Sequence, residues 1–399
     1  MKINIIRGQN QIGGSIIEIS TDKTKIVFDA GINLDEGEKV EIPEIDGLFC
    51  GEKKYDAVFV SHYHSDHIGL LGYILKDIPV YMGEKAFEIV KAANDYKGKK
   101  CDFYPEFIYE DKPIFVNDVK ITPFVCDHSA FDSYMFLIEW EGKKILYTGD
   151  FRANGRLDYK KLLLKIPVVD ALIIEGTTLS REDVVHNIEE KTLEDIAVNA
   201  LAKYDGPAFV MMSAMNIDRL VTMSNVAKKT DRIFLEDIYT AKIAKASRET
   251  TLIPDGNTRV FMTGGDKQYD MLSEFEDIKI GKNAISKKKF LMCVRPSMKN
   301  YLSKLNEICS FENGILFYGM WKGYLKRDDM KDFVDFMEAK GVKLHILHTS
   351  GHADAITVEN LIEDVNPKAI IPVHTENADW FLRYNDIHII FDCRNYEVE

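Results

Sequence analysis

The chain has 399 residues, of which 46% are hydrophobic and 29% charged, and its formal net charge is −13. This length exceeds one ordinary core and predicts two domains, or one domain with a large insertion. The excess of acids argues against indiscriminate binding to nucleic acid, although basic residues at 287–289 and 322–327 could line a local groove. No apolar run reaches the roughly 20 residues of a membrane helix, and the first residues lack a secretion signal. We therefore expect a cytoplasmic protein without a membrane partner.

Short β-strands separated by turn residues dominate the chain up to about residue 175, for example SIIEIS, DAVFVSH and SYMFLIEW. One helix, HIGLLGYILK, is predicted directly after a histidine-rich segment. From about residue 182 helices and strands alternate, which predicts a parallel sheet covered by helices. The strands VKLHIL and AIIPVH follow after residue 341, and histidine-bearing loops lie on both sides of the alternating block. The block is therefore interpreted as an insertion, with segments 1–181, 182–341 and 342–399.

The segment SHYHSDH at 61–67 is the strongest chemical signal in the chain. It follows the strand DAVFV, and in an extended chain His62 and His64 point the same way. Asp66 and His67 are expected at the start of the next helix, turned toward a neighbouring point. Imidazole and carboxylate ligands suit zinc, with manganese or iron as alternatives. Three histidines and an aspartate within six residues therefore predict a metal site.

Three further residues, Asp29, His128 and Asp150, lie where predicted strands end and loops converge. Two metal ions about 3.5–4 Å apart need a bridging carboxylate and further ligands. His128 and Asp150 are the candidates for these ligands, and Asp29 is the candidate for a residue that orients one of them. Each residue alone would be an ordinary loop residue, so the prediction depends on their combination with the histidine cluster.

The motif order FDAG, HYHSDH, CDHSAFDS and YTGDFR resembles that of the metallo-β-lactamase superfamily. The resemblance implies an α/β fold class, with a four-layer αββα sandwich that carries the metal site at its sheet edges. Three later motifs resemble the β-CASP branch, and in particular ribonuclease J: Glu175 in LIIEGTT, His352 in HTSGHAD and His374 in IPVHTE. That branch also inserts an α/β domain between the first two of these motifs.

Spacing and resemblance together imply two divalent cations, zinc in the first place. One is expected at His62, His64 and His128 and the other at Asp66, His67 and His374, with Asp150 as the bridge. His352 remains without a metal and is expected to stabilise charge on a phosphodiester or to protonate its leaving oxygen.

Glu175 is expected to fix the tautomer of His352 through its second ring nitrogen. Asp66 is counted with His352 and Glu175 among the catalytic residues. Ser350 and Gly351, which precede His352, are expected to support a ligand or to contact phosphate.

The resemblance implies a ribonuclease of the β-CASP type, because His374 goes with RNA-processing members whereas members acting on DNA tend to carry an apolar residue there. RNA is therefore the expected partner, ahead of DNA. The alternative is a metallo-hydrolase of a small ester, thioester or cyclic nucleotide, which the bulky Met320, Trp321 and Tyr324 would suit. A binding protein with a vestigial site is disfavoured by the complete ligand set. The mode of cleavage, the physiological metal and a homo-oligomeric state stay open.

Overall fold

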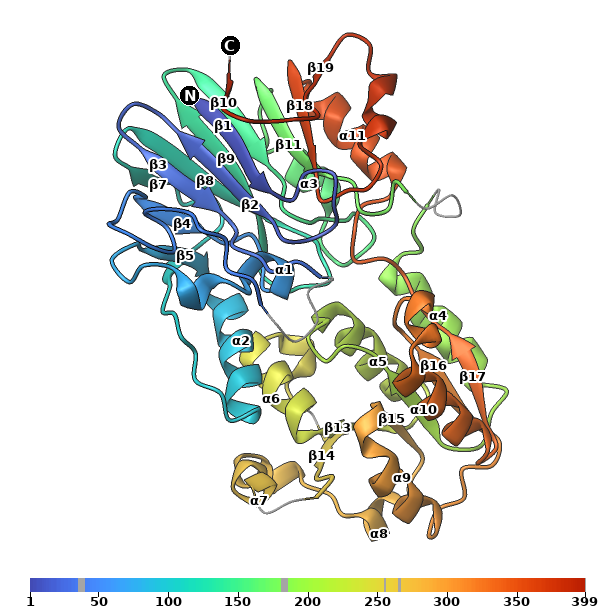
Figure 1. The fold of residues 1–399 in the computed structure, drawn as a ribbon. Coiled ribbons are helices and arrows are strands. Elements are labelled where there is room, and N and C mark those ends of the chain that lie inside the picture. The colour runs from blue at the N-terminus through green and yellow to red at the C-terminus, as the bar shows by residue number, and fades with distance from the viewer. Residues whose placement is uncertain (35–39, 181–185, 255, 265–266, 399) are drawn as a thin grey trace.

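The computed structural model describes residues 1–34, 40–180, 186–254, 256–264 and 267–398. Its strands form three sheets, two of which face each other in the upper half of Figure 1. The strands of the first sheet are, in spatial order, β20 (Tyr396–Glu397), β1 (Lys2–Arg7), β2 (Ile16–Ser20), β3 (Lys25–Phe28), β4 (Ala57–Phe59), β5 (Val80–Gly83) and β6 (Glu106–Ile108). The strands of the second are β19 (His388–Ile389), β18 (Ala369–Val373), β11 (Ala171–Glu175), β10 (Lys143–Tyr147), β9 (Ser133–Trp140), β8 (Val119–Cys126) and β7 (Ile114–Val116).

Alternating apolar residues of these two sheets form a shared core between them. Phe28 and Phe59 of the first sheet contact Phe136 of the second, with ring centroids 5.2 and 5.8 Å from Phe136, and all three side chains are fully buried. Helices cover the two outer faces: α1 (Ser65–Ile68) and α2 (Glu84–Tyr96) on the first sheet, and α3 (Tyr159–Leu163) and α11 (Ala355–Val365) on the second. The four-layer αββα sandwich implied by the sequence is confirmed.

The third sheet is wholly parallel and lies in the lower half of Figure 1. Its strands are, in spatial order, β14 (Thr258–Phe261), β13 (Ile233–Asp237), β15 (Phe290–Cys293), β12 (Ala208–Met211), β16 (Gly314–Tyr318) and β17 (Val342–Ile346). Its helices are α4 (Glu190–Leu201), α5 (Ile217–Lys229), α6 (Ile238–Ser247), α7 (Lys267–Leu272), α8 (Lys282–Ile285), α9 (Lys299–Asn306) and α10 (Asp328–Glu338). The alternation seen in the sequence thus produces the expected helix-covered parallel sheet.

Two sequence-based details need correction. The chain after the histidine cluster is not one helix: α1 has four residues and a separate 3-10 turn follows at Leu71–Tyr73. Gly69 and Gly72 lie in this stretch, and glycine disfavours a continuous helix. Strand β17 pairs with β16 in the third sheet, so the boundary predicted between 341 and 342 falls one strand too early.

The other predicted boundary, between residues 181 and 182, lies outside the described residues. The division of the chain into segments stays a proposal, with the return to the sandwich placed after Ile346. Within the part of the chain that the structure describes, no helix combines the length and apolar character needed to cross a bilayer.

Candidate metal centre

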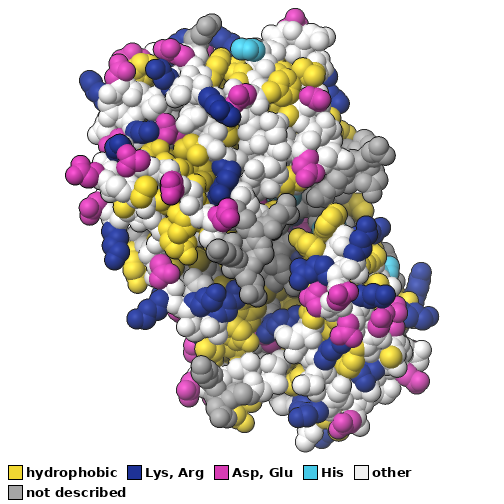
Figure 2. All heavy atoms as spheres, in the orientation of Figure 1, with side chains coloured by type: hydrophobic (Ala, Val, Ile, Leu, Met, Phe, Trp, Pro, Cys, Tyr) yellow, Lys and Arg dark blue, Asp and Glu magenta, His cyan; other side chains and the backbone are white. Residues whose placement is uncertain are grey.

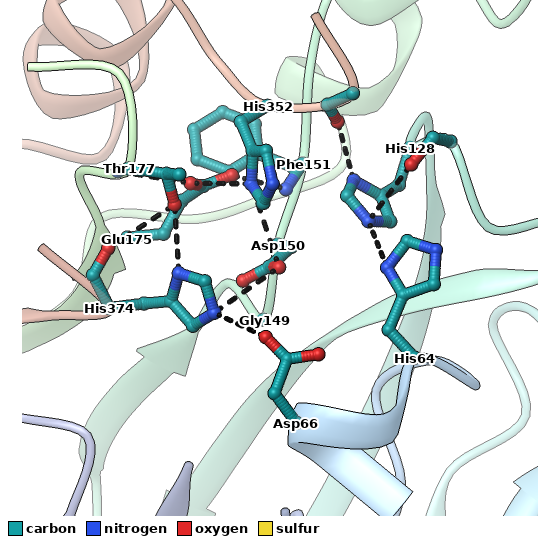
Figure 3. Close-up of polar contacts among 12 residues, drawn as sticks. His64, Asp66, His128, Gly149, Asp150, Phe151, Glu175, Thr177, His352 and His374 are labelled. Atoms are coloured by element: carbon teal, nitrogen blue, oxygen red, sulfur yellow. Dashed lines mark hydrogen bonds and ion pairs between the residues drawn. The ribbon is translucent and has the colours of Figure 1, made fainter. Parts of the chain in front are cut away.

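The predicted ligands come together where strands of both sandwich sheets end (Figure 3). Asp29 follows β3, and the segment from His62 to His67 follows β4 and enters α1. His128 follows β8, and Asp150 follows β10. His374 follows β18, and His352 lies in the loop between β17 and α11. Residues separated by more than 300 positions thus meet at one edge.

His62, His64 and His128 form the first group of candidate ligands. The Nδ1 atom of His64 lies 3.2 Å from His62 Nε2 and 3.1 Å from His128 Nε2. Burial lowers the pKa of all three imidazoles, that of His64 to about 4, so the rings are neutral near pH 7. Neutral imidazoles present lone pairs, which is the form that binds a cation.

Asp66, His67 and His374 form the second group. The Nε2 atom of His374 lies 3.1 Å from Asp66 Oδ2, and both side chains are buried. Burial disfavours ionisation of Asp66, but its contacts with His374 and His67 outweigh this effect and lower its pKa. Asp66 is therefore a carboxylate at neutral pH.

Asp150 lies between the two groups. Its Oδ2 atom is 3.7 Å from His62 Nε2, 3.3 Å from His67 Nε2 and 3.7 Å from His374 Nε2. Its side chain is only 2% exposed. A single carboxylate oxygen therefore faces ligand atoms of both groups, as a bridging carboxylate would.

These spacings fit metal ions better than they fit a closed hydrogen-bond network. Two atoms that each bind zinc at about 2.1 Å in tetrahedral geometry are roughly 3.4 Å apart, close to the separations given above. Among the described residues, His67 Nε2 and Asp150 Oδ1 are buried without a hydrogen-bond partner. Orphaned buried polar atoms are rare in native proteins and require an explanation. The donor set of imidazoles and carboxylates is that of a divalent cation such as zinc.

Two segments of the chain match models of known protein families. Residues 11–168 match the metallo-beta-lactamase superfamily, and residues 327–383 match the Zn-dependent metallo-hydrolase RNA specificity domain. Residues 11–168 therefore form a metallo-β-lactamase domain. This superfamily implies binding of divalent metal, and the clustered histidines and aspartates of this chain could hold such ions.

Several known proteins are similar to the chain. Ribonuclease J from Mycoplasma pneumoniae is 24% identical over 410 residues, which cover 94% of this chain and 68% of that protein. Ribonuclease J from Helicobacter pylori is 30% identical over 161 residues, and the match covers 39% of this chain but only 23% of that protein. A crystal structure of a protein of unknown function from Enterococcus faecalis aligns with a TM-score of 0.81 and 20% identity, over 99% of this chain and 98% of that chain. At this identity the structural likeness shows the fold alone.

The side chains that hold the candidate ligands were only partly foreseen from the sequence. The Oδ2 atom of Asp29, the predicted orienting residue, lies 2.7 Å from His67 Nδ1 and leaves Nε2 facing Asp150. Asp29 is itself held by the Ser61 backbone and hydroxyl groups, each at 2.7 Å, and by the Tyr147 hydroxyl at 2.6 Å. Such partners fix the tautomer and the angle of a metal-binding imidazole.

Two further orienting groups act on the other histidines. The Thr177 hydroxyl lies 2.8 Å from His374 Nδ1, and the Gly351 carbonyl accepts a hydrogen bond from His128 Nδ1. Each contact leaves the Nε2 atom of its histidine facing the centre (Figure 3). Gly351 was predicted to support the site, whereas Thr177, Ser61 and Tyr147 were missed. Thr177 lies two residues after Glu175, and this closeness was the only signal available in the sequence.

The backbone near the centre adopts conformations that ordinary residues avoid. Asp29 and His374 have φ values of 59° and 51°, in the left-handed region. Such conformations persist only where the surrounding structure enforces them, and they cluster at functional sites. Gly149, which precedes Asp150, has a φ of 51°, and a Cβ there would lie 2.6 Å from the Cβ of Ser61. A tight turn therefore aims Asp150 at the centre.

His352 and Glu175 form the predicted contact beside the centre. The Nδ1 atom of His352 lies 3.0 Å from Glu175 Oε2 and 3.5 Å from Asp150 Oδ2. Burial opposes protonation of His352, but these two carboxylates raise its pKa to about 9. Its side chain is 22% exposed, and its ligand atom lies within 4.8 Å of those of Asp150, Glu175 and His374. Ser350 supports the loop, because its hydroxyl accepts a hydrogen bond from the His352 N–H at 3.0 Å.

Arg152 connects the loops that carry the candidate ligands to the third sheet and its helices, and it was not foreseen. Its fully buried guanidinium donates to Asp127 Oδ1 and to Asp218 Oδ2, both at 2.6 Å, and to the Ser350 carbonyl at 3.3 Å. Asp127 precedes the candidate ligand His128, and Asp218 lies on α5. One side chain thus joins the two loops of the sandwich to the third sheet and its helices.

A second buried arginine extends this contact. Arg219 on α5 binds Glu190 with two nitrogens, at 3.0 and 2.9 Å, and donates to the Leu347 carbonyl at 2.9 Å. Glu190 also lies 3.6 Å from Arg152. We call Asp127, Arg152, Glu190, Asp218 and Arg219 the junction network.

Proposed function

We propose that this protein is a metal-dependent ribonuclease that hydrolyses phosphodiester bonds with two divalent cations, zinc in the first place. The observation that carries the proposal is the position of Asp150 Oδ2, within 3.7 Å of ligand atoms from both groups of candidate ligands. Such an arrangement suits a two-cation centre, in which one carboxylate is shared.

In this proposal His62, His64 and His128 hold one cation, and Asp66, His67 and His374 hold the other. When bound, two such cations activate water as a nucleophile and neutralise the charge that grows on the phosphoryl oxygens. Asp29, Thr177 and Gly351 keep the imidazoles in place through their Nδ1 atoms.

His352 supplies chemistry of its own. Glu175 and Asp150 engage its Nδ1 atom, so Nε2 is the ring atom left to face a substrate. A protonated Nε2 can stabilise the pentavalent phosphoryl group or donate its proton to the leaving oxygen. Glu175 in turn accepts a hydrogen bond from the Phe151 N–H at 2.8 Å, which fixes its own position.

RNA is the proposed substrate for two reasons. Residues 327–383 match an RNA specificity domain and include His352 and His374, and several similar proteins bear the name Ribonuclease J. The inserted domain also exposes Trp321 and Tyr324, which are 46% and 40% exposed, next to basic residues at 322–327. Exposed aromatic rings beside cationic side chains stack bases and contact phosphates in single-stranded nucleic acid.

A substrate panel tests the proposal directly. Labelled single-stranded RNA, DNA of the same sequence and a chromogenic ester are each incubated with the protein, with the chelated protein, and with the chelated protein after zinc is restored. We expect cleavage of RNA, slower cleavage of DNA, loss on chelation and recovery with zinc. Asp150→Asn is the matched control and should stay inactive in every arm. Hydrolysis of the ester alone would favour the small-ester alternative, and no hydrolysis in any arm would contradict the proposal.

A further inference from the structure

The inserted domain contains a cavity of about 350 Å³ that is separate from the metal centre. It lies between β13, α6 and the 3-10 helices at Thr250–Leu252 and Ser273–Ile278, near the labels α6 and β14 in Figure 1. Its apolar walls are formed by Ala241, Ala244, Leu252, Ile253, Phe275 and Ile278. This volume is within the range of small-molecule sites in proteins.

Glu236 is the feature that distinguishes this cavity from an ordinary packing defect. Its side chain lines the cavity, and the residue is 3% exposed. No group in the described part of the chain donates a hydrogen bond to its carboxyl group or forms an ion pair with it. Burial, reinforced by Asp237, raises the pKa of Glu236 to about 8. A buried carboxyl group without a partner is disfavoured by desolvation and is uncommon in native proteins.

The bases near the cavity do not supply the missing partner. Lys245 lies 3.9 Å from Glu274, with its ammonium 5.8 Å from the Phe275 ring centroid. Arg248 pairs at 2.8 Å with Glu84 at the start of α2. The acids that line the cavity outnumber these two bases; they are Glu236, Glu249, Glu274, Glu276 and Asp277. Glu274 is paired with Lys242 at 2.5 Å and Glu276 with Lys279, whereas Glu236 has no basic partner among the described residues, so a cation is the ligand that Glu236 would accept.

We propose that this cavity binds a small organic cation, an amine on a compact apolar body, with the ammonium group paired to Glu236. The apolar walls would cover the body of the ligand, and the carboxylate would accept hydrogen bonds from the ammonium group. Such a pair gives the otherwise unpartnered Glu236 a hydrogen-bonding partner of opposite charge. This proposal does not depend on the nuclease activity.

Benzylamine is a suitable probe, because it is a cation at neutral pH and benzyl alcohol is a neutral molecule of nearly the same shape. Isothermal titration calorimetry with the full chain should show benzylamine binding at least about tenfold more tightly than benzyl alcohol, the scale of a hydrogen bond to a charged group. Equal affinity for the two probes would overturn the assignment of a cation. Absence of heat for both probes at millimolar concentration would overturn the site itself.

Two variants locate the binding event. Glu236→Gln keeps the shape of the side chain and should weaken benzylamine by about tenfold or more, while benzyl alcohol is unaffected. The matched control is Glu276→Gln, which removes the same charge from a side chain that lines the cavity but is 64% exposed. It should change the affinity for benzylamine by less than about threefold, because exposed charges are screened. Equal effects of the two variants would contradict a specific pair, and if Glu236→Gln does not fold, the comparison of the two probes on the unmodified protein decides.

Discussion

The metal centre and the junction network lie next to each other, are both buried and are both rich in charge, yet their charges are matched differently. In the junction network every nitrogen of the Arg152 and Arg219 guanidinium groups has a carboxylate or carbonyl partner. In the metal centre imidazole nitrogens face one another: His62 Nε2 lies 3.2 Å from His64 Nδ1, and His67 Nε2 is among the described buried atoms that lack a hydrogen-bond partner.

The difference teaches how to separate a structural cluster from a binding site. A buried cluster whose donors and acceptors satisfy one another needs nothing from outside, and its removal should reduce stability. A cluster of facing acceptors is complete only with a cation, and its removal should reduce metal content and turnover. Each prediction below tests one side of this comparison.

The largest effect is expected at His352. His352→Ala should keep two metals per chain and the fold, and should lower RNA turnover by about 10²–10⁴-fold, the scale for a positioned acid or base. Elemental analysis and single-turnover kinetics measure the two quantities. Glu175→Gln should have a smaller effect of the same kind, because Glu175 only orients the ring.

Two other histidine variants serve as controls for the metal content and activity of His352→Ala. His374→Ala should lose one metal together with activity, whereas His348→Ala, four residues before His352 and outside the candidate ligand groups, should keep both. Loss of metal from His352→Ala would make His352 a ligand, which its place 3.5 Å from Asp150 would then explain. Unchanged turnover in His352→Ala would make it a bystander.

The second prediction concerns the junction network. Arg152→Met leaves Asp127 and Asp218 buried without their partner, and removal of one member of a buried ion pair costs about 3–5 kcal/mol. Burial and the neighbouring Asp127 already raise the pKa of Asp218 to about 6, although Arg152 acts to lower it. Without Arg152 the charged form of Asp218 would be less stable still. Denaturant titration should show the loss in free energy of unfolding, and the folded fraction should still hold two metals. A stable Arg152→Met variant that lacks metal would place Arg152 in the metal centre instead.

The third prediction concerns the orientation of a ligand. Asp29→Asn removes the charge that holds His67 Nδ1 and should lower metal affinity by about 10–100-fold, the range measured for such supporting groups. Competition with a chelator of known affinity measures the change. Asp118→Asn is the control, since Asp118 accepts hydrogen bonds from Thr21, Thr24 and Trp140 and has no contact with the centre. If Asp29→Asn binds metal as tightly as the unmodified protein, Asp29 has no such role.

The sequence allowed the fold class and the gathering of the candidate ligands to be predicted, because both depend on short patterns. Strand ends carry Asp29, His128 and Asp150, and each motif is recognisable within a few residues. Their function as ligands stays a prediction. The supporting groups were harder to foresee, because a threonine hydroxyl such as that of Thr177 or a backbone carbonyl such as that of Gly351 has no distinctive pattern.

Features that depend on distant pairing could not be predicted. Strand β17 has the same apolar pattern whichever sheet it joins, and only its pairing with β16 decides the question. Arg152 and Asp218 are 66 residues apart and lie in different parts of the fold, so no local sequence pattern predicts their ion pair. Glu236 follows an ordinary strand pattern, and its missing partner is apparent only in three dimensions.

The smallest effect is expected at Arg156, which offers a matched test of the junction network. Like Arg152, Arg156 follows β10 and reaches the helices of the third sheet, where it lies 3.5 Å from Glu194 on α4 and 2.8 Å from the Thr222 hydroxyl on α5. Its side chain is 32% exposed, however, and Glu194 has a second partner in Lys229 at 2.8 Å. Arg156→Met should therefore lower the free energy of unfolding by only about 0–1 kcal/mol, as for exposed ion pairs. Denaturant titration of Arg152→Met and Arg156→Met side by side shows whether the loss of stability depends on burial of the ion pair or only on the contact between the sandwich and the helices of the third sheet. Equal losses in the two variants would mean that the domain contact itself, and not the burial of a matched charge, determines the stability of this junction.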